Sequence, residues 1–461
     1  MTENAANKIE EKMQKKFVVG LGLTGLSCVR YLKKQGYDVI AFDTRKTAPG
    51  LQVVKRDYPD VEVYLGDITE DILDDVDQII SSPGISLHCP LLTAAKQRNI
   101  EIVGDVEIFS SLAKAPIIAI TGSNGKSTTT TLLADMIKAD GKRVEIGGNI
   151  GVPVLDLLTE GAEIPDYYVL ELSSFQLDTT SQLKAKAAVV LNISEDHMDR
   201  YTSLDEYGKS KLVIYENAEN RVINSEDQWL RTNVDSSNNY TCFTTQEPQV
   251  GEYGLRVIDN EEWIVFGDEK ILKTKKLKIK GRHQVANALA AIALGDLCRI
   301  SREGMCKALK KFKGLKHRTQ FVEKIKGVSY INDSKGTNVG ATVAAVNGLD
   351  APVVLIAGGV GKGADFSELK SVVKDKVSYV ILIGKDARLI EKAIEGVVPV
   401  VHAQSMEEAV WLSADVAKKG DYVLLSPACA SFDMYGNYEQ RGEAFMQAVE
   451  LVASELKNND G

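Results

Sequence analysis

The chain has 461 residues, of which 44% are hydrophobic and 26% are charged, and its formal net charge is −9 at pH 7. This composition is typical of a folded protein of about three domains and argues against extended disorder. The net acidity and the lack of a long basic run argue against nucleic acid and anionic membrane as partners. The charged first sixteen residues lack the apolar core of a secretory signal, and no apolar run approaches the ~20 residues of a membrane-spanning helix, so we expect a cytosolic protein.

The cysteines and histidines show no spacing typical of a zinc site or a disulfide framework. The six cysteines are Cys28, Cys89, Cys242, Cys298, Cys306 and Cys429. We expect them to be small core or neutral residues, and we expect any metal to be held by hard oxygen ligands.

The first hundred residues alternate strand-like and helical patterns. A strand at 16–22 enters a glycine turn, a helix follows at 27–36, and further strands are predicted at 37–43 and 76–84. Strands that alternate with helices predict a parallel, doubly wound sheet.

A second block repeats this alternation with one interruption. It opens with strand, glycine loop and helix over 115–141, and the apolar runs at 167–175 and 186–194 are typical of buried strands. Between about 220 and 280 short strands and turns are expected, before a helix at 281–297 with apolar residues at three- and four-residue steps.

A third block from about residue 314 again alternates strands with helices such as the one at 406–420. Its strands are predicted at 328–333, 352–359, 377–384 and 421–428. The expected fold class is therefore α/β with three domains, at 1–104, 105–314 and 315–461.

The first glycine loop, at Gly20–Gly25, has the pattern GxGxxG between a strand and a helix. Asp43 ends the next strand, close to the spacing expected for an acidic residue on a ribose. Taken alone, the pattern predicts a dinucleotide-binding enzyme, but the glycines establish only a tight turn and close backbone approach to a phosphate. A purely structural turn stays an alternative.

The second glycine loop runs from Thr121 to Thr128 and has the GK[ST] ending of a P-loop. Position 120 is Ile120, so the first glycine of the strict pattern is absent. The strand, loop and helix still follow in the required order. Backbone N–H groups would cradle phosphate oxygens, Lys126 would supply a charge to the terminal phosphates, and the Ser127 hydroxyl would reach Mg²⁺.

Motifs along nearly the whole chain resemble those of the Mur ligases, the amide-forming enzymes of peptidoglycan synthesis. Besides TGSNGKST, they are GLGLTGLS with DTR, SPGI, GGNIG, ELSSFQL, EDHMDRY, GRHQVANALAA, HRTQF, INDSKGTN, GGVGKGADF and LLSPACASFDMYGNYEQRG, which occur in this order from one end of the chain to the other. The resemblance is to the members that add D-glutamate.

The resemblance implies a Rossmann-like first domain that binds UDP, a central ATPase domain with a mostly parallel sheet, and a C-terminal α/β domain. It implies an ATP-dependent ligase that joins D-glutamate to UDP-N-acetylmuramoyl-L-alanine through an acyl phosphate, in the cytoplasmic synthesis of cell-wall precursors that supports cell shape and division. ATP, two Mg²⁺ ions and a monomeric chain are implied as well. Two polyanions must meet in this reaction, so cations are needed around the transferred phosphoryl group.

The nucleotide site implied by the resemblance combines the second glycine loop with residues further along the chain. Its members are Gly122, Ser123, Asn124, Gly125, Lys126, Ser127, Thr128, Asn287, Arg318, Asp333 and Lys335. Arg318 is expected on the phosphates, because its fork of donors suits oxyanions, and Asp333 on the ATP ribose.

The metal and catalytic residues implied are Ser127, Glu171, His197 and Lys211, with Lys126 as a catalytic cation. Lys211 matches the family lysine that CO₂ carbamylates, and the carbamate then holds the second metal. Lys209 is the rival lysine, but residues two apart on a helix face different ways, so only one can point inward. Glu171 could instead be a surface acid at a strand end, and Glu195, Asp196 and Asp199 could be solvated loop acids.

The substrate residues implied lie in the first and last parts of the chain. Leu23, Thr24, Gly25, Asp43, Thr44 and Arg45 would hold the uracil and diphosphate, Asn149 the muramoyl part, and Thr337, Lys362, Ser431 and Tyr438 the D-glutamate. Better-known members carry Phe at the last of these positions, which puts the fine packing around the amino acid in doubt. Helix capping and core packing are the alternatives for Ser431 and Tyr438.

Other functions stay open at this point. A sister ligase for another amino acid would share the ATP loop, as would an enzyme of the folylpolyglutamate-synthase type, although the latter lacks a leading Rossmann-like domain. An NAD-dependent oxidoreductase would use the first glycine loop with Asp43 and leave TGSNGKST without a role. A nucleotide-sensing scaffold would not need Glu171, His197 and Lys211.

Overall fold

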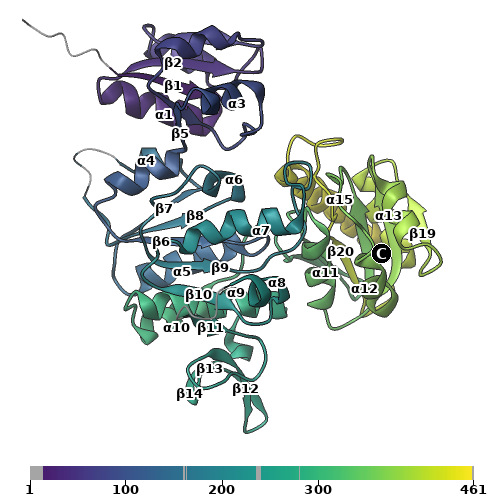
Figure 1. Cartoon of the computed structure of the whole chain (residues 1–461). Helices are drawn as coiled ribbons and strands as arrows, with labels where there is room; N and C mark the ends of the chain where they lie inside the picture. Colours follow the sequence, from purple (N-terminus) through teal and green to yellow (C-terminus); the bar gives the residue numbers. More distant parts are fainter. Residues whose placement is uncertain (1–13, 159–160, 162, 235–239, 280, 459–461) are drawn as a thin grey trace, which may run out of the picture.

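The computed structural model describes residues 14–158, 161, 163–234, 240–279 and 281–458. Figure 1 shows three lobes along the chain, coloured purple to blue, blue to green, and green to yellow. Each lobe contains a sheet flanked by helices, so the three α/β domains predicted from the sequence are confirmed.

The first domain is a parallel sheet in the order β3-β2-β1-β4-β5. Its strands are β1 (Lys15–Val19), β2 (Asp38–Asp43), β3 (Glu62–Leu65), β4 (Gln78–Ser81) and β5 (Glu101–Val103). Its helices are α1 (Leu23–Lys34), α2 (Leu51–Asp57), the 3₁₀ helix η1 (Glu70–Asp75) and α3 (Pro90–Gln97). The strand order changes direction between β1 and β4, and ligands of such sheets bind beyond the carboxyl ends of strands at this switch point.

The central domain has the strand order β14-β13-β12-β11-β10-β9-β6-β8-β7, parallel from β7 to β12 and antiparallel beyond. The strands are β6 (Ile117–Thr121), β7 (Val144–Gly148), β8 (Tyr167–Glu171), β9 (Ala185–Val190), β10 (Arg221–Asn224), β11 (Thr241–Phe243), β12 (Tyr253–Ile258), β13 (Glu261–Phe266) and β14 (Glu269–Lys273). The last three project from the foot of the domain in Figure 1. They are the short strands expected between about 220 and 280.

Helices cover both faces of this sheet. They are α4 (Asp105–Leu112), α5 (Lys126–Ala139), η2 (Val154–Leu157), α6 (Ser174–Leu177), α7 (Leu204–Leu212), η3 (Val213–Tyr215), α8 (Gln228–Asn233), η4 (Thr274–Lys276), α9 (Arg282–Leu297) and α10 (Arg302–Lys311). Helices α5 and α9 bury their apolar residues in one core on the sheet. A second core runs from the first domain through α4 to α7, so these two domains share apolar packing.

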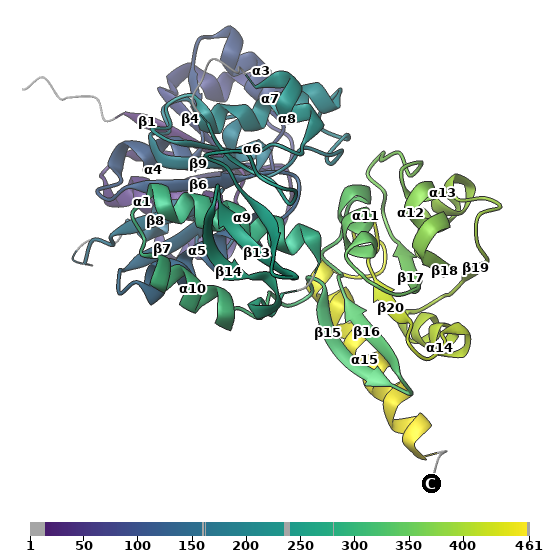
Figure 2. The ribbon, with the colours of Figure 1, turned by 90° about the horizontal axis from the view of Figure 1, so that it is seen from below.

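The third domain has the strand order β15-β16-β20-β17-β18-β19, with only β15 antiparallel to its neighbour among the described strands. Its elements are β15 (Gln320–Ile325), β16 (Val328–Asn332), α11 (Val339–Asn347), β17 (Val353–Gly358), α12 (Leu369–Lys376), β18 (Val377–Ile383), α13 (Ala387–Ala393), β19 (Val400–His402), α14 (Met406–Val416), β20 (Tyr422–Leu425) and α15 (Tyr438–Asn458). Figure 2 shows β15, β16 and α15 running together. None of the helices described has the length and hydropathy to cross a membrane.

The first glycine loop offers a matched pair of substitutions. A Cβ added to Gly25 would lie 1.7 Å from the carbonyl oxygen of Gly20, whereas one added to Gly22 meets nothing within 4 Å. Gly25→Ala is therefore expected to lower the free energy of unfolding of the first domain by about 3 kcal/mol, as overpacking does. Gly22→Ala should cost less than about 1 kcal/mol, the effect of losing a helix-capping glycine. Urea unfolding followed by circular dichroism measures both, and equal losses would contradict this account.

Candidate active site

The second glycine loop joins β6 to α5 and depends on two glycines. Gly122 has φ 146° and Gly125 has φ 87°, both in the region that favours glycine. A Cβ on Gly125 would also lie 2.2 Å from Oδ1 of Asn287, which approaches the loop from α9. Helix α5 begins at Lys126, so free N–H groups of its first turn are available to an anion.

Two cations lie at this loop. The Lys126 ammonium donates to the carbonyl oxygens of Gly122 at 2.7 Å and Ser123 at 2.9 Å. Loss of surrounding water lowers the pKa of Lys126 from its ordinary value. Arg318, which precedes β15, donates from Nη2 to Oγ of Ser127 at 2.6 Å. The third domain thus brings a guanidinium to the nucleotide loop of the central domain.

Glu171 ends β8, and only 2% of its surface is exposed. Its Oε1 accepts a hydrogen bond from Nδ2 of Asn149 at 2.8 Å, while Oε2 is buried without a partner. A buried carboxylate oxygen without a donor is costly unless a cation satisfies it. This residue therefore fits a hard cation such as Mg²⁺.

A metal at this position would need ligands of several kinds. Among the described residues, no group of three or more His, Cys, Asp or Glu gathers as a ready-made metal site. Mg²⁺ is commonly held by one or two carboxylates together with phosphate oxygens and water. Glu171 and Ser127 line the same cavity and could offer a carboxylate and a hydroxyl to such an ion.

Helix α7 presents its two lysines to different surroundings, as their spacing predicts. Lys211 is 1% exposed, and its Nζ lies 4.5 Å from the centre of the Tyr207 ring. The Lys209 side chain is 65% exposed and pairs with Asp205 at 2.6 Å. Burial, and next the nearby Lys126 charge, lower the pKa of Lys211 well below its ordinary value. A neutral amine of this kind is nucleophilic.

His197 and Asp196 follow β9 at the junction with the third domain. The His197 ring meets the Phe175 ring edge-on at 4.7 Å, and burial lowers the His197 pKa to about 4. Asp196 accepts hydrogen bonds from Nζ of Lys362 at 3.0 Å and Nδ2 of Asn338 at 3.1 Å. Burial alone would raise the pKa of Asp196, but the Lys362 charge holds it at about 2. Asp196 is thus a buried anion paired with Lys362, and not the solvated loop acid that the sequence allowed.

Four residues in and beside this site have a strained backbone. His197, His317, Thr319 and Lys362 have φ between 46° and 59°, a conformation that non-glycine residues rarely adopt. Such positions cost about 1–3 kcal/mol each and cluster at functional sites, where the surrounding structure holds them. Two of them flank Arg318.

Two cavities meet at the nucleotide loop. The first, of about 320 Å³, brings together most of the predicted catalytic and amino-acid residues. Its predicted members are Ser123, Asn124, Gly125, Lys126, Ser127, Asn149, Glu171, His197, Lys211, Arg318, Lys335, Thr337, Lys362, Ser431 and Tyr438. The second, of about 490 Å³, contains Thr128, Asn287 and Asp333, and it shares Asn124, Gly125, Arg318 and Lys335 with the first.

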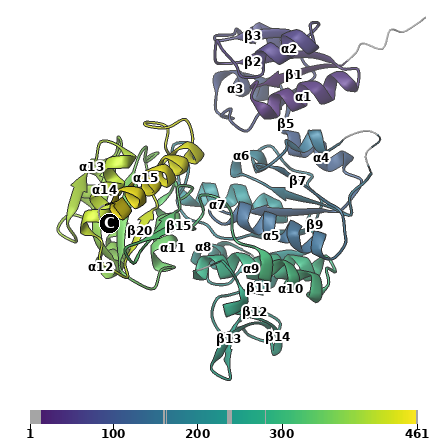
Figure 3. The same cartoon turned by 180° about the vertical axis from the view of Figure 1, so that it is seen from behind.

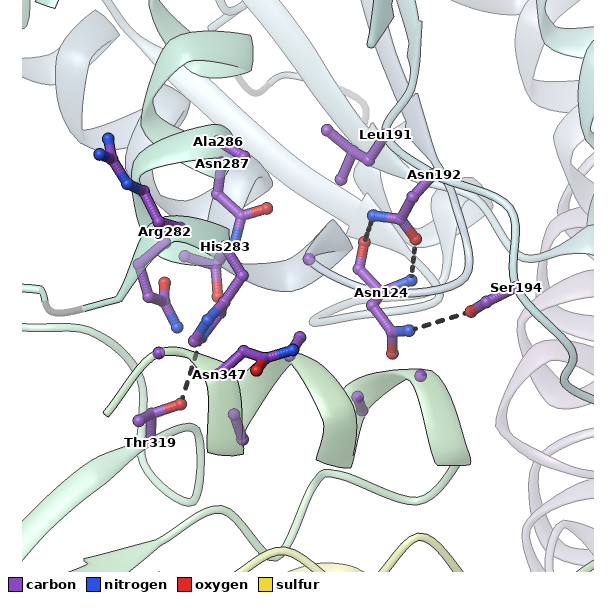
Figure 4. Close-up of a pocket in the computed structure, with 18 of the residues that line it drawn as sticks. Asn124, Leu191, Asn192, Ser194, Arg282, His283, Ala286, Asn287, Thr319 and Asn347 are labelled. Atoms are coloured by element: carbon purple, nitrogen blue, oxygen red, sulfur yellow. Dashed lines mark hydrogen bonds between the residues drawn. The ribbon is translucent and has the colours of Figure 1, made fainter. Parts of the chain in front are cut away.

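Figure 4 shows the second cavity, with His283 and Asn287 on one side and Asn347 on the facing helix α11. Asn124 is held there by hydrogen bonds with Asn192 and Ser194. The cavity therefore lies between the central and third domains, beside the nucleotide loop.

Asp333 and Lys335 lie where this cavity meets the first. The two carboxylate oxygens of Asp333 accept from Thr319 at 2.9 Å and Ser426 at 2.8 Å, and burial raises its pKa to about 6. Nζ of Lys335 lies 4.0 Å from the centre of the Tyr438 ring, and burial lowers its pKa to about 8. The Tyr438 hydroxyl donates to Glu439 at 3.2 Å, which accommodates the extra oxygen relative to Phe.

The predicted UDP residues lie in the first domain and line neither of these two cavities. Leu23 is 78% exposed beside the first glycine loop. Asp43 accepts hydrogen bonds from the Leu21 N–H at 2.8 Å and from the Arg45 N–H at 2.9 Å, and it binds the Arg45 guanidinium. Burial opposes this ionisation, but the hydrogen bonds from Arg45 and Leu21 lower the Asp43 pKa to about 2. The carboxylate therefore holds the first glycine loop and the Arg45 side chain together.

In comparisons with known proteins, most of the chain matches domains of one family. Residues 14–104 match the family "Mur ligase MurD-like, N-terminal domain", residues 120–295 "Mur ligase middle domain" and residues 317–429 "Mur ligase, glutamate ligase domain". The chain is 47% identical to the UDP-N-acetylmuramoylalanine--D-glutamate ligase of Nitrosococcus oceani, over 95% of this chain and 96% of that one. It is 48% identical to the enzyme of the same name from Hahella chejuensis, over 94% and 98%.

A solved structure shares the fold at low sequence identity. The MurF ligase of Thermotoga maritima in complex with ADP superposes with a TM-score of 0.59 at 17% identity, over 96% of this chain and 97% of that one. This likeness concerns the arrangement of the three domains.

Proposed function

The chain belongs to the Mur ligase family, and on that premise we propose that it joins D-glutamate to UDP-N-acetylmuramoyl-L-alanine in an ATP-driven reaction of cytoplasmic peptidoglycan-precursor synthesis. The relatives that carry this name match over nearly the full chain. The observation that supports the chemistry best is the shared cavity of Lys126, Glu171, Lys211 and Lys362.

The reaction has two steps. The substrate carboxylate attacks the γ-phosphorus of ATP, an oxygen–phosphorus bond forms, and ADP leaves. The amine of D-glutamate then attacks the acyl-phosphate carbon, loses a proton, and inorganic phosphate leaves. Lys126 and Arg318, which both contact the nucleotide loop, would neutralise the transferred phosphoryl oxygens.

We assign the metals to two groups of side chains. Ser127 and Glu171 would hold one Mg²⁺, and His197 with carbamylated Lys211 would hold the second. When bound, the ions supply positive charge that offsets repulsion between the substrate carboxylate and ATP. The lowered pKa of Lys211 favours its neutral amine, the form that can attack CO₂ with loss of a proton to give the carbamate.

The remaining contacts follow the two cavities. The nucleotide loop from Gly122 to Thr128, with Asn287, Asp333 and Lys335, would bind ATP. Asn149 would contact the muramoyl part. Four residues would bind D-glutamate: Thr337, Lys362, Ser431 and Tyr438. A carboxylate of D-glutamate would replace Asp196 as the ion-pair partner of Lys362. Leu23, Thr24, Gly25, Asp43, Thr44 and Arg45 would hold the UDP group, and Asp43 also stabilises the loop.

We place the domain boundaries at 104/105 and 314/315, between the last strand of one sheet and the first of the next. A monomeric chain is proposed, as the resemblance to the family implies.

Phosphate release from ATP and Mg²⁺ tests this function directly. With UDP-N-acetylmuramoyl-L-alanine present, D-glutamate should stimulate release at least about 100-fold more than L-glutamate, L-lysine or diaminopimelate. Release with a different amino acid would keep the mechanism and assign a sister ligase. Tight NAD binding without any release would instead favour the oxidoreductase.

A further inference from the structure

A third cavity, of about 280 Å³, lies between the first and central domains, and Arg200 is one of the residues that line it. Ser82 and Ile85 line it from the first domain, and Phe175 and Arg200 from the central domain. Figures 1 and 3 show the first domain facing α4 and α6, the helix that carries Phe175. The proposed reaction gives Arg200 no role.

Arg200 binds the first domain with both arms of its guanidinium. Nη1 donates to the carbonyl oxygen of Gly84 at 3.2 Å, and Nη2 donates to that of Ile85 at 3.1 Å. The same guanidinium lies 4.3 Å from the centre of the Phe175 ring. A planar fork that stacks on a ring while donating to two carbonyl groups is a geometry that lysine cannot reproduce.

The segment that Arg200 holds is fixed to the first glycine loop. The Ser82 hydroxyl donates to the carbonyl oxygen of Gly20 at 2.8 Å, and the Ser82 N–H donates to Val19 at 2.9 Å. The Ile85 N–H closes the turn on Ser82 at 3.0 Å. Arg200 is therefore linked indirectly to the glycine loop: it binds a hydrogen-bonded turn of backbone, and that turn binds the loop.

On its other side, Arg200 is linked to the first of the two cavities at the nucleotide loop, which we call the catalytic cavity. Phe175 lines both that cavity and the interdomain one, and its ring lies against His197. The N–H groups of Arg200 and Tyr201 both donate to the carbonyl oxygen of His197, at 2.8 Å and 3.1 Å. The strained backbone at His197 and the Arg200 side chain thus belong to one hydrogen-bonded turn.

We infer that Arg200 is a positioning residue that fixes the first glycine loop relative to the catalytic cavity, so that a substrate anchored by its nucleotide end presents its other end to the reacting groups. This inference rests on the proposed function. A ligand that spans two domains binds tightly only when their orientation satisfies both ends at once, and small misplacements lower rates about 100-fold.

The test compares the binding of UDP, which occupies only the nucleotide end of the site, with the binding of the whole substrate. In Arg200→Ala and Arg200→Lys, calorimetry should show UDP binding within about twofold of the wild type, while affinity for UDP-N-acetylmuramoyl-L-alanine falls at least about 10-fold. Arg56→Ala, at an exposed arginine of the first domain, is the control and should change neither affinity. Equal loss of both affinities would make Arg200 a direct ligand or a folding residue, and no loss would overturn its role.

A second readout does not depend on the substrate. Amide hydrogen exchange over residues 82–86 should be at least about 10-fold faster in Arg200→Ala than in the wild type, because the turn loses its contacts with the central domain. Unchanged exchange would overturn the inference. If the wild type binds UDP-N-acetylmuramoyl-L-alanine no more tightly than UDP, the proposed function fails, while faster exchange would still establish the contact.

Discussion

Lys211→Ala is expected to lower the rate of phosphate release at least about 100-fold, whereas Lys209→Ala should keep it within about twofold. The two lysines lie on the same helix, but only Lys211 faces the catalytic cavity, and Lys209 pairs with Asp205 at the surface. Burial lowers the pKa of the Lys211 amine, which favours the neutral form that CO₂ modifies, and its loss would remove the carbamate assigned to the second metal. Steady-state assays of both variants with saturating D-glutamate measure the difference.

Rescue by small acids distinguishes a carbamate from an ordinary lysine. Formate or acetate should partly restore activity in Lys211→Ala, because truncation of the buried side chain leaves room for a carboxylate. Neither acid should stimulate the wild type. In the intact protein, labelled bicarbonate should yield a carbamate signal by NMR that Lys211→Ala lacks and Lys209→Ala keeps. Full activity of Lys211→Ala would remove this residue from the mechanism.

Local patterns in the sequence were enough to predict the three α/β domains and the central nucleotide loop. The β6–loop–α5 unit followed from an apolar strand, two glycines and a helix that starts at Lys126. The inward orientation of one lysine on α7 followed from helical periodicity. Both of these signals lie within one short stretch of chain, a single strand–loop–helix unit or a single helix.

Contacts between domains could not be predicted in this way. Asp196 and Lys362 are 166 residues apart in the chain, and nothing in either motif shows that they form an ion pair. Arg200 likewise reaches Gly84 and Ile85 across a domain boundary. Asp43 has the spacing of a ribose ligand, but its oxygens are engaged by the Leu21 N–H and by Arg45. A sequence pattern gives the position of a carboxylate, whereas the donors around it decide what it can bind.

Glu171→Gln should separate activity from stability. The amide keeps an oxygen for Asn149, but it replaces the unpartnered buried carboxylate oxygen with a neutral group. We expect phosphate release to fall about 100- to 1,000-fold, the range for losing one electrostatic stabiliser of a transition state. The free energy of unfolding should stay unchanged or rise by about 1–2 kcal/mol, because a buried carboxylate oxygen that has no hydrogen-bond donor is removed.

The matched control is Glu145→Gln, on the neighbouring strand β7, where the side chain is exposed. It should change neither activity nor stability beyond about 0.5 kcal/mol. Mg²⁺ titrations then identify the cause of the loss in Glu171→Gln: the concentration for half-maximal activity should rise, and ADP affinity should lose its dependence on Mg²⁺. A variant with reduced activity but an unchanged Mg²⁺ requirement would show that Glu171 acts through packing with Asn149 instead of holding a cation, and the unpartnered Oε2 would then be a site of local strain.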